Sequence, residues 1–326
     1  MPTDFVTVHS GSGQPEISIV VPIYNCERFV AEAVDSLLAQ QGVIAEILIS
    51  DDASTDNTFG VAHRTVVDYI NRVGSKHTVR MRAGTARLQR DHLHLLTNTA
   101  ACDLICQAHG DDISHELRCA ILVRAFNQEA PDASMIFVNT SVIDGQGNII
   151  QEPKQFSLPK IRIDPVDYSR IINALDDNLI GSNMAWRRSR FEHFPPLTTS
   201  YSAYGHDRVM AFRSVVSGGC YMLDTPLLKK RLHDDQWHRE ILSFENKSEN
   251  LFNYQLIRLS AFSAMKRDLI FLKEHKLLEE DQFDQHLKNV DIMLVTVTKF
   301  LSNSINQLVI AGHVNKWLKP SEIPKQ

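Results

Sequence analysis

Up to about residue 130, segments with the hydrophobic pattern of a buried strand alternate with segments that have the pattern of a helix. Short runs of β-branched and aliphatic residues, at 17–22, 46–50 and 103–107, are typical of strands buried in a parallel sheet. Segments between them place apolar residues at helical spacing, for example at 29–38 and 57–73. Strand and helix in alternation predict βαβ units, and therefore an α/β fold with a mostly parallel sheet flanked by helices.

The pattern changes in the second half of the chain. Residues 134–150 predict a strand followed by a hairpin, and a helix is expected to begin near Asp207. From about Arg239 to Trp317 the sequence has helical spacing and almost no glycine or proline. The pattern divides the chain into a flexible tail, an α/β domain and a C-terminal helical extension, at residues 1–15, 16–238 and 239–326.

The last helix of the extension carries more apolar side chains than a free, solvated helix would show, among them Ile292, Val295 and Phe300. Three interpretations stay open: packing on the α/β domain, pairing into a homodimer, and docking on a membrane surface. Few positive charges, chiefly Lys299 and Lys316, argue against strong attraction to anionic lipid. We expect the extension to be structural and self-associating rather than catalytic.

The composition is that of an ordinary globular protein. Hydrophobic residues make up 43% of the 326 residues, charged residues 22%, and the formal net charge is −5, so nucleic acid is not an expected partner. The five cysteines include no CxxC pair, which argues against a disulfide framework or a zinc site. There is no signal-peptide pattern and no stretch of roughly twenty apolar residues. We therefore expect a cytoplasmic protein, and contact with the inner face of the membrane stays open as an alternative.

Polar residues gather where the predicted parallel strands end. They are the segment 22–25 and the pairs Asp51-Asp52 and Asp111-Asp112, and in an open parallel sheet such ends converge on one crevice. Neither a G-x-G-x-x-G fingerprint nor a P-loop is present. A phosphate ligand would therefore need a hard divalent cation, which the adjacent carboxylates at 111 and 112 are suited to bind.

Two of these segments carry a recognisable motif. The sequences ISIVVPIYN at 17–25 and EILISDDASTDNT at 46–58, at this spacing, resemble the start of the family 2 inverting glycosyltransferases with the GT-A fold. The resemblance continues through GDDI at 110–113, GSNMAWRR at 181–188 and GHD at 205–207, and it covers roughly residues 16 to 235. It implies a GT-A, Rossmann-like sheet flanked by helices.

The resemblance also implies how a nucleotide-sugar donor would bind. Pro22, Tyr24 and Asn25 would lie against the nucleoside, and Asp52 would receive a hydrogen bond from the base. Asp111 would contact the ribose as well as the metal. From the residues alone, Tyr24 could instead be a packed aromatic and Asp52 a helix cap.

The implied cofactor is Mn²⁺ or Mg²⁺, bridging the carboxylates of Asp111 and Asp112 to the diphosphate. His233, in the segment Arg-x-His, resembles a histidine that reaches the metal or the diphosphate, although a histidine that ends a strand is as often simply exposed. The sequence departs from the family pattern at His109, where an acid is usual. A neutral imidazole can bind a metal, but a loop histidine without a role is an equal alternative.

Residues expected on the acceptor side lie later in the chain. Asp207 aligns with the catalytic base, which takes the proton of the acceptor hydroxyl; the alternative is a carboxylate that only caps the following helix. His206 replaces the usual glutamate beside it and could touch the acceptor. Trp186 resembles a residue of the acceptor wall, with a core tryptophan as the alternative.

The sequence as a whole predicts an inverting, metal-dependent glycosyltransferase of the polysaccharide-biosynthesis type. Its donor is expected to be a nucleotide sugar of the UDP or dTDP type, and its acceptor a glycan or a lipid-linked glycan. A nucleotidyltransferase is the competing enzyme class, but it would leave Asp207 without an evident task. A binding module that kept the fold and lost catalysis is the non-enzymatic alternative.

Overall fold

The fold is organised around one mixed β-sheet. A computed structural model describes residues 5–84, 89–153, 160–163, 181–195, 206–234 and 247–310, and these contribute eleven strands. Across the sheet the order is β1 (Val6–His9), β4 (Thr78–Ala83), β3 (Ala45–Asp51), β2 (Ile17–Ile23), β5 (Leu104–Gln107), β10 (Met184–Arg187), β7 (Met135–Ile143), β11 (Cys220–Arg231) and β6 (Ile113–Ser114). Two further strands pair at the side: β8 (Ile149–Gln151) with β7, and β9 (Lys160–Ile163) with β11.

The central part of the sheet is parallel. Strands β4, β3, β2 and β5 run in one direction, with Ile17 opposite Ala45 and Ile23 opposite Asp51. Parallel pairing buries these strands on both faces, which explains their nearly continuous apolar sequence. It also brings their carboxyl ends to one edge, so the α/β fold predicted from the alternating pattern is confirmed.

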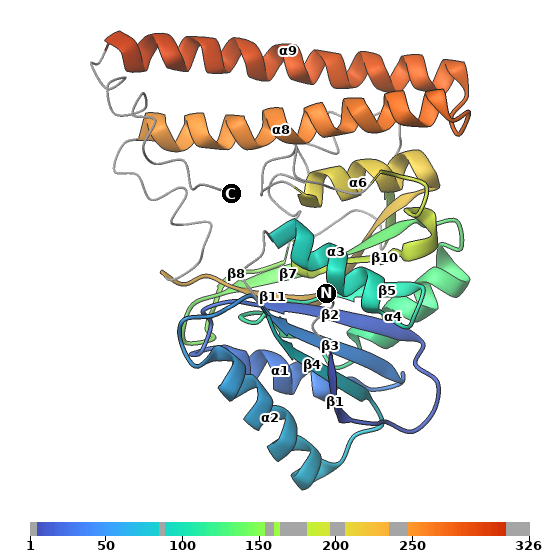
Figure 1. Cartoon of the computed structure of the whole chain (residues 1–326), viewed down its shortest axis with the longest axis vertical. Helices are drawn as coiled ribbons and strands as arrows, with labels where there is room; N and C mark the ends of the chain where they lie inside the picture. The colour runs from blue at the N-terminus through green and yellow to red at the C-terminus, as the bar shows by residue number, and fades with distance from the viewer. Residues whose placement is uncertain are drawn as a thin grey trace. The chain divides into compact units, whose positions relative to one another are not determined.

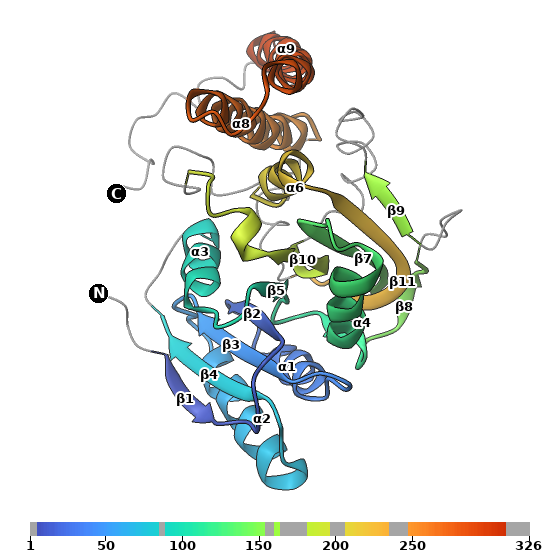
Figure 2. The same cartoon turned by 90° about the vertical axis from the view of Figure 1, so that its right-hand side faces the viewer.

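Helices cover both faces of this parallel part (Figures 1 and 2). Ile19, Ile47, Leu37 and Leu122 belong to one buried cluster on the face covered by the first, second and fourth helices. Val20 alternates to the opposite face, where the third helix packs on β2. The helices of this region are α1 (Val30–Leu38), α2 (Thr58–Val73), α3 (Gln89–Thr99), α4 (Arg118–Arg124) with its π-helical continuation (Ala125–Glu129), and α6 (His206–Ser217).

The N-terminal segment differs from the prediction. Within the tail expected at 1–15, Val6–His9 forms β1, which pairs antiparallel with β4 and places Val6 opposite Met81. Without β1, strand β4 would present a row of unpaired backbone groups at the edge of the sheet. Three consecutive β-branched residues, Val6, Thr7 and Val8, suit the segment to this role, so the expectation of a flexible tail was wrong for residues 6–9.

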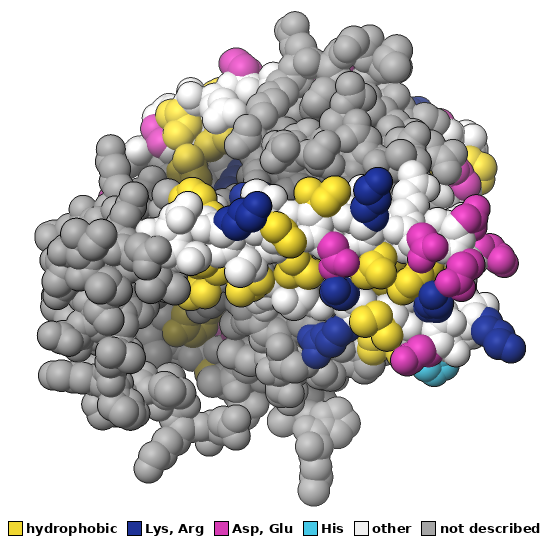
Figure 3. All heavy atoms as spheres, turned by 90° about the horizontal axis from the view of Figure 1, so that it is seen from above, with side chains coloured by type: hydrophobic (Ala, Val, Ile, Leu, Met, Phe, Trp, Pro, Cys, Tyr) yellow, Lys and Arg dark blue, Asp and Glu magenta, His cyan; other side chains and the backbone are white. Residues whose placement is uncertain are grey.

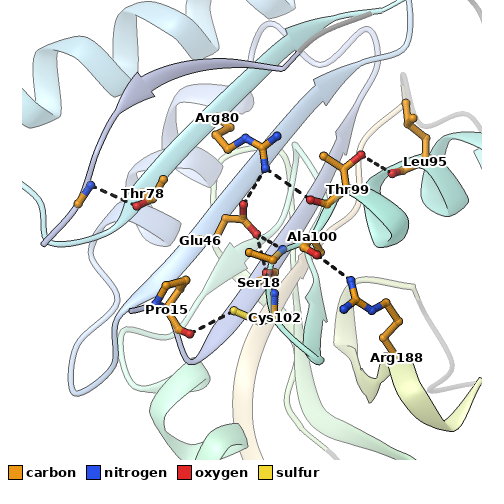
Figure 4. Close-up of polar contacts among 12 residues, drawn as sticks. Pro15, Ser18, Glu46, Thr78, Arg80, Leu95, Thr99, Ala100, Cys102 and Arg188 are labelled. Carbon is orange, nitrogen blue, oxygen red and sulfur yellow. Dashed lines mark hydrogen bonds and ion pairs between the residues drawn. The ribbon is translucent and has the colours of Figure 1, made fainter. Parts of the chain in front are cut away.

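A buried polar network lies at the amino-terminal ends of β2 and β3 (Figure 4). The Glu46 carboxylate accepts hydrogen bonds from the Ser18 hydroxyl at 2.7 Å, the Ala101 N–H at 2.7 Å and the Arg80 guanidinium at 3.0 Å. Ser18 Oγ in turn accepts from the Cys102 N–H at 3.1 Å. The network ties the start of β5 to the neighbouring strands, and we refer to it as the Glu46 network.

The chain forms two compact units, Met1–His233 and Asp234–Gln326. In the second unit, α8 (Lys247–Glu274) and α9 (Glu280–Ile310) pack against each other as an antiparallel pair (Figure 1). The boundary expected after residue 238 falls in the stretch 235–246, which lies outside the described residues.

An ion pair and a cation–π contact join the two helices. Lys266 on α8 contacts the Asp291 carboxylate on α9 at 2.8 Å, and Lys273 lies 4.1 Å from the centre of the Phe283 ring. Some apolar side chains of α9 remain exposed, including Ile292 and Val295, and they are interspersed with charged side chains (Figure 3). Within the described part of the chain, no helix is both long and apolar enough to cross a membrane.

Candidate active site

The loops that follow β2 and β3 are braced against each other. The Asn25 N–H donates to Ser54 Oγ at 3.0 Å, and Asn25 Oδ1 accepts from the Thr55 N–H at 2.8 Å. Asn25 has φ +44°, a left-handed conformation that asparagine tolerates better than most residues. Asn25 therefore joins the loop after β2 to the loop after β3. It does not cap α1, which begins at Val30 without a side-chain cap.

Asp51 and Asp52 have different environments at the end of β3. Asp51 is buried and accepts from the Ser54 N–H and hydroxyl, at 3.0 and 2.5 Å, so it shapes the turn. Asp52 is half-buried, and its N–H donates to the Ile23 carbonyl at 2.9 Å. Since α2 starts beyond Asn57, the helix-cap alternative for Asp52 does not hold.

The donor-side residues include one that sequence reasoning missed. His92 on α3 is almost fully buried, and its Nδ1 lies 3.8 Å from Asp52 Oδ1. Tyr24 is 49% exposed, which removes the packed-aromatic alternative, and Pro22 beside it is half-buried. Nothing in the pattern of α3 distinguishes His92 from the nearby His94; only the fold brings it to Asp52.

The loop after β5 brings three metal-binding groups together. His109, Asp111 and Asp112 each offer one ligand atom, and these atoms lie within 4.8 Å of one another. Asp112 is 5% exposed, and its Oδ1 accepts the Arg231 N–H at 2.9 Å. Burial, followed by the charge of Asp111, raises the pKa of the Asp112 carboxyl, while His109 acts in the opposite direction. We refer to these three residues as the Asp111 cluster.

His233, predicted near the metal, lies beside this cluster. Its Nε2 is 3.2 Å from Asp111 Oδ2, and its ring packs on that of Phe29 with the ring centres 4.3 Å apart. The side chain is buried, and no described residue forms a hydrogen bond with its Nδ1. The contact with Phe29 fixes the ring so that Nε2 faces the carboxylate. The structure thus brings Asp111, Asp112 and His233 together, while their binding of a metal stays a prediction.

Two buried arginines support the Asp111 cluster from inside the protein. Arg231 Nε donates to the Asp111 carbonyl at 3.0 Å, and its guanidinium forms an ion pair with Glu32 on α1. Arg118 on α4 donates to the carbonyls of Gln107 and Ser182. Arginine offers several donors in a fixed geometry, which suits it to hold several carbonyls at once. Sequence reasoning had assigned no role to Arg118, because its partners are distant backbone groups.

The residues expected on the acceptor side are only partly described. Asp207 lies in the first turn of α6, where its carboxylate is half-buried and Oδ1 is buried. His206 opens the same helix, but its side chain lies outside the described part of the structure. Trp186 is 1% exposed on β10, between β5 and β7, which fits a core tryptophan better than an acceptor wall.

Comparison with known proteins identifies the family. Residues 18–194, more than half of the 326 residues, match Glycosyl transferase family 2. The chain therefore belongs to family 2 of the glycosyltransferases and is a transferase enzyme.

Individual relatives match smaller parts of their own length. "Putative glycosyltransferase EpsE" of Bacillus subtilis is 35% identical over 104 residues, which are 32% of this chain and 36% of EpsE. An uncharacterised glycosyltransferase of Rickettsia felis is 21% identical over 257 residues, 78% of this chain and 40% of that protein. Chondroitin synthase of Pasteurella multocida is 44% identical over 50 residues, 15% of this chain and 5% of the synthase. The matches to these three relatives thus span well under two thirds of their lengths.

Solved structures share the fold. Staphylococcus aureus TarS 1–349 in complex with UDP-GlcNAc is 14% identical, with a TM-score of 0.53 over 90% of this chain and 92% of that one. The mannosyltransferase PcManGT from Pyrobaculum calidifontis, in complex with GDP-Man and Mn²⁺, is also 14% identical, with a TM-score of 0.52 over 98% and 85%. At this identity the similarity shows the fold, which is that of the GT-A glycosyltransferases.

Proposed function

We propose that this glycosyltransferase moves a sugar from a nucleoside diphosphate of the UDP or dTDP type to a glycan or lipid-linked acceptor, with inversion and with a divalent cation. The observation that carries the proposal is the meeting of three polar groups at one edge of the sheet: the 22–25 loop, Asp52 and the Asp111 cluster. Two solved structures with this fold contain nucleotide sugars, UDP-GlcNAc in one and GDP-Man in the other, which supports a nucleotide-sugar donor.

The residues of the Asp111 cluster fit a divalent cation. Asp111 and Asp112 place two carboxylates together, and burial, followed by the charge of Asp111, raises the pKa of the Asp112 carboxyl, a cost that a bound cation would offset. Asp111 and Asp112 would hold the ion, and His233, whose Nε2 contacts Asp111, would lie beside the diphosphate. Bound there, it would supply positive charge that binds the diphosphate and stabilises the departing nucleotide. PcManGT, which shares the fold, contains Mn²⁺ in its complex.

The donor's nucleoside would lie in the crevice between the braced loops. Tyr24 has an exposed ring beside half-buried Pro22, and both offer apolar surface to a base or ribose. Asp52 can accept a hydrogen bond from the N3–H of uracil or thymine, with His92 behind it. Asn25 contributes by holding Thr55, so its substitution would widen the crevice rather than remove a ligand contact.

Asp207 would act as the general base. In an inverting transfer the acceptor oxygen attacks the anomeric carbon, the bond from that carbon to the diphosphate breaks, and a carboxylate takes the hydroxyl proton. Its position in the first turn of α6 suits a carboxylate, because the amino end of a helix stabilises negative charge. His206 precedes it and would line the acceptor side.

A donor-cleavage assay tests this proposal. With Mn²⁺ or Mg²⁺ present, a matching nucleotide sugar should release a nucleoside diphosphate, and EDTA should abolish the release. Asp207→Asn keeps the size of the side chain but cannot take a proton, so turnover should fall about 100-fold or more while donor binding persists. Release of pyrophosphate would instead indicate a nucleotidyltransferase. Donor binding without any turnover on a panel of glycan acceptors would indicate a binding module.

We propose that the α8–α9 pair is structural and joins two copies of the chain. Ile292 and Val295 are both more than half exposed on α9, and pairing with the helices of a second copy would bury them. Replacing both with glutamate in the full chain should lower the mass measured by light scattering from dimer to monomer, with donor cleavage unchanged. A monomeric wild type contradicts the proposal, and binding of that monomer to anionic vesicles would favour membrane docking.

A further inference from the structure

The histidine at position 109 lies where the family pattern usually has an acid, and its ring is held between two partners. Its Nδ1 is 3.8 Å from Asp112 Oδ2, and its Nε2 is 3.1 Å from the side-chain amide of Gln107. The side chain is 27% exposed, so the ring stands at the boundary between the protein and the crevice. A loop histidine without a role would not be expected to have both ring nitrogens directed at polar partners.

Gln107 is the less obvious member of this arrangement. It is 1% exposed, at the end of β5, and no described residue forms a hydrogen bond with its Oε1. The side-chain amide occupies the same volume when it is turned over. With the oxygen toward His109, it accepts the Nε2–H, and Nδ1 keeps its lone pair on the side of Asp112. Histidines that bind metals commonly donate their second ring N–H to an oxygen in this way.

Gly181 keeps room for the pair. A Cβ atom at this position would lie 2.4 Å from Gln107 Nε2 and 3.0 Å from His109 Nε2, so any larger residue would displace the ring or the amide. Arg118 holds the same two segments together, through the carbonyls of Gln107 and Ser182. The position of the His109 ring is therefore set by the fold and not by the loop alone.

The distances fit ligands that share one ion better than a direct hydrogen bond. At 3.8 Å, Nδ1 and Asp112 Oδ2 are too far apart to be hydrogen-bonded. Two atoms that are each about 2.0–2.2 Å from an ion lie at most about 4.4 Å apart. The three ligand atoms of the Asp111 cluster lie within 4.8 Å, so a small side-chain rotation brings even the widest pair into range.

We infer that His109 Nδ1 is a direct nitrogen ligand of the divalent cation bound by Asp111 and Asp112, and that Gln107 is its positioning residue. The inference rests on the metal dependence proposed above. Exchange of an acid for imidazole removes one negative charge and one oxygen from the ligand set. Because Mg²⁺ prefers oxygen ligands and imidazole suits transition metals, the site selects Mn²⁺ or a similar ion over Mg²⁺.

Pulsed EPR of the full chain with MnCl₂, with and without UDP, tests the coordination directly. Bound Mn²⁺ should show coupling to an imidazole ¹⁴N in the wild type and in His233→Gln, and the coupling should disappear in His109→Asp. In competition titrations, His109→Asp should shift the preference from Mn²⁺ toward Mg²⁺ by about tenfold or more. This readout does not depend on turnover.

Variants of Gln107 test its positioning role. Gln107→Leu should weaken Mn²⁺ binding by about tenfold or more, as is typical for loss of a partner of a metal ligand. Gln107→Glu retains an oxygen that accepts the Nε2–H and should restore most of that affinity. A purely structural role would make both variants bind Mn²⁺ equally well once their folding is matched by circular dichroism.

The outcomes separate this inference from the proposed function. If Mn²⁺ binds and supports donor cleavage but shows no imidazole coupling, the His109 inference is wrong and the proposed function stands. If the coupling disappears in His233→Gln and persists in His109→Asp, the nitrogen ligand is His233, and the His109 inference is again wrong. Full donor cleavage in EDTA, with no Mn²⁺ bound, overturns the metal dependence itself.

Discussion

Two groups of buried charges lie at opposite edges of the same parallel strands. At the amino ends, the Glu46 network surrounds one carboxylate with a hydroxyl, a backbone N–H and a guanidinium (Figure 4). At the carboxyl ends, the Asp111 cluster places two carboxylates beside each other. Burial of a charge is tolerated where donors and opposite charge surround it, and is costly where a like charge is the neighbour.

This difference indicates which of the two groups stabilises the fold. The polar groups around Glu46 complement one another, so the network needs no ligand. In the Asp111 cluster, the pKa of the Asp112 carboxyl is raised by burial and by Asp111, and His233 Nδ1 has no hydrogen-bond partner among the described residues. Adjacent carboxylates with a raised pKa are typical of a functional site, and a bound cation would offset their negative charge.

The largest effect is expected at Asp111. Asp111→Asn removes a metal-binding charge, so turnover should fall at least about 100-fold, which corresponds to about 2.7 kcal/mol of transition-state stabilisation. The free energy of unfolding should stay the same or rise, because one of two like charges is gone. Donor cleavage and urea denaturation of the same preparation measure both quantities. Loss of stability comparable to the loss of activity would contradict the functional assignment.

Glu46→Ala should have the opposite profile. It leaves the Ser18 hydroxyl and the Ala101 N–H without their acceptor, and the free energy of unfolding should fall by about 3 kcal/mol. Turnover per folded molecule should stay within about twofold of the wild type. Glu46→Gln, which keeps an acceptor oxygen, is the matched control and should lose about 1 kcal/mol. A strong loss of turnover in correctly folded Glu46→Gln would show that the Glu46 network and the Asp111 cluster are coupled.

Asp112 stands between the two cases, because it both faces the cluster and accepts the Arg231 N–H. Asp112→Asn keeps the acceptor and should change the free energy of unfolding by less than about 1 kcal/mol, whereas Asp112→Ala should lose about 1–3 kcal/mol. Both should lower turnover by about tenfold or more. Equal stability of the two variants would show that the hydrogen bond to Arg231 contributes little.

The smallest expected effect is a pH dependence of the free energy of unfolding, caused by His77 near the amino-terminal ends of the parallel strands. Burial lowers the pKa of His77 from its usual value of 6.5; its Nδ1 accepts the Ala45 N–H, and Nε2 lies 3.0 Å from the Gln40 carbonyl. The unfolded chain therefore takes up a proton on His77 at a higher pH than the folded chain does. The stabilisation that neutral His77 contributes is complete above pH 6.5, and it declines below pH 6.5 until the pH reaches the pKa of His77 in the folded state.

Urea denaturation at pH 7.5 and pH 5.5 measures this decline. His77→Gln removes the titrating ring and should show a smaller loss of stability between the two pH values than the wild type. His63 is exposed, so His63→Gln serves as the control and should leave the decline unchanged. An identical decline in His77→Gln and wild type would assign it to other groups.

The sequence by itself determined the framework of the catalytic region. Largely apolar runs such as 17–22 and 46–50 predicted the parallel strands, because a strand buried on both faces is mostly apolar. The strands end where these runs end, so the positions of Asp52 and Asp111 at one edge followed from the pattern. Helical spacing likewise predicted the long helices of the extension. The motifs around Asp52 and Asp111 also indicated the family, which the comparisons confirm.

Only the tertiary structure decided which polar residues share an environment. The pairing of His92 with Asp52, of His233 with Asp111 and of Gln107 with His109 depends on how separate elements meet. Local patterns report the preference of each segment for helix or strand and for burial. Contacts between segments depend on how strands and loops distant in sequence come together. The strand β1 was missed for the same reason: its β-branched residues permit a strand, but pairing with β4 decides that one forms.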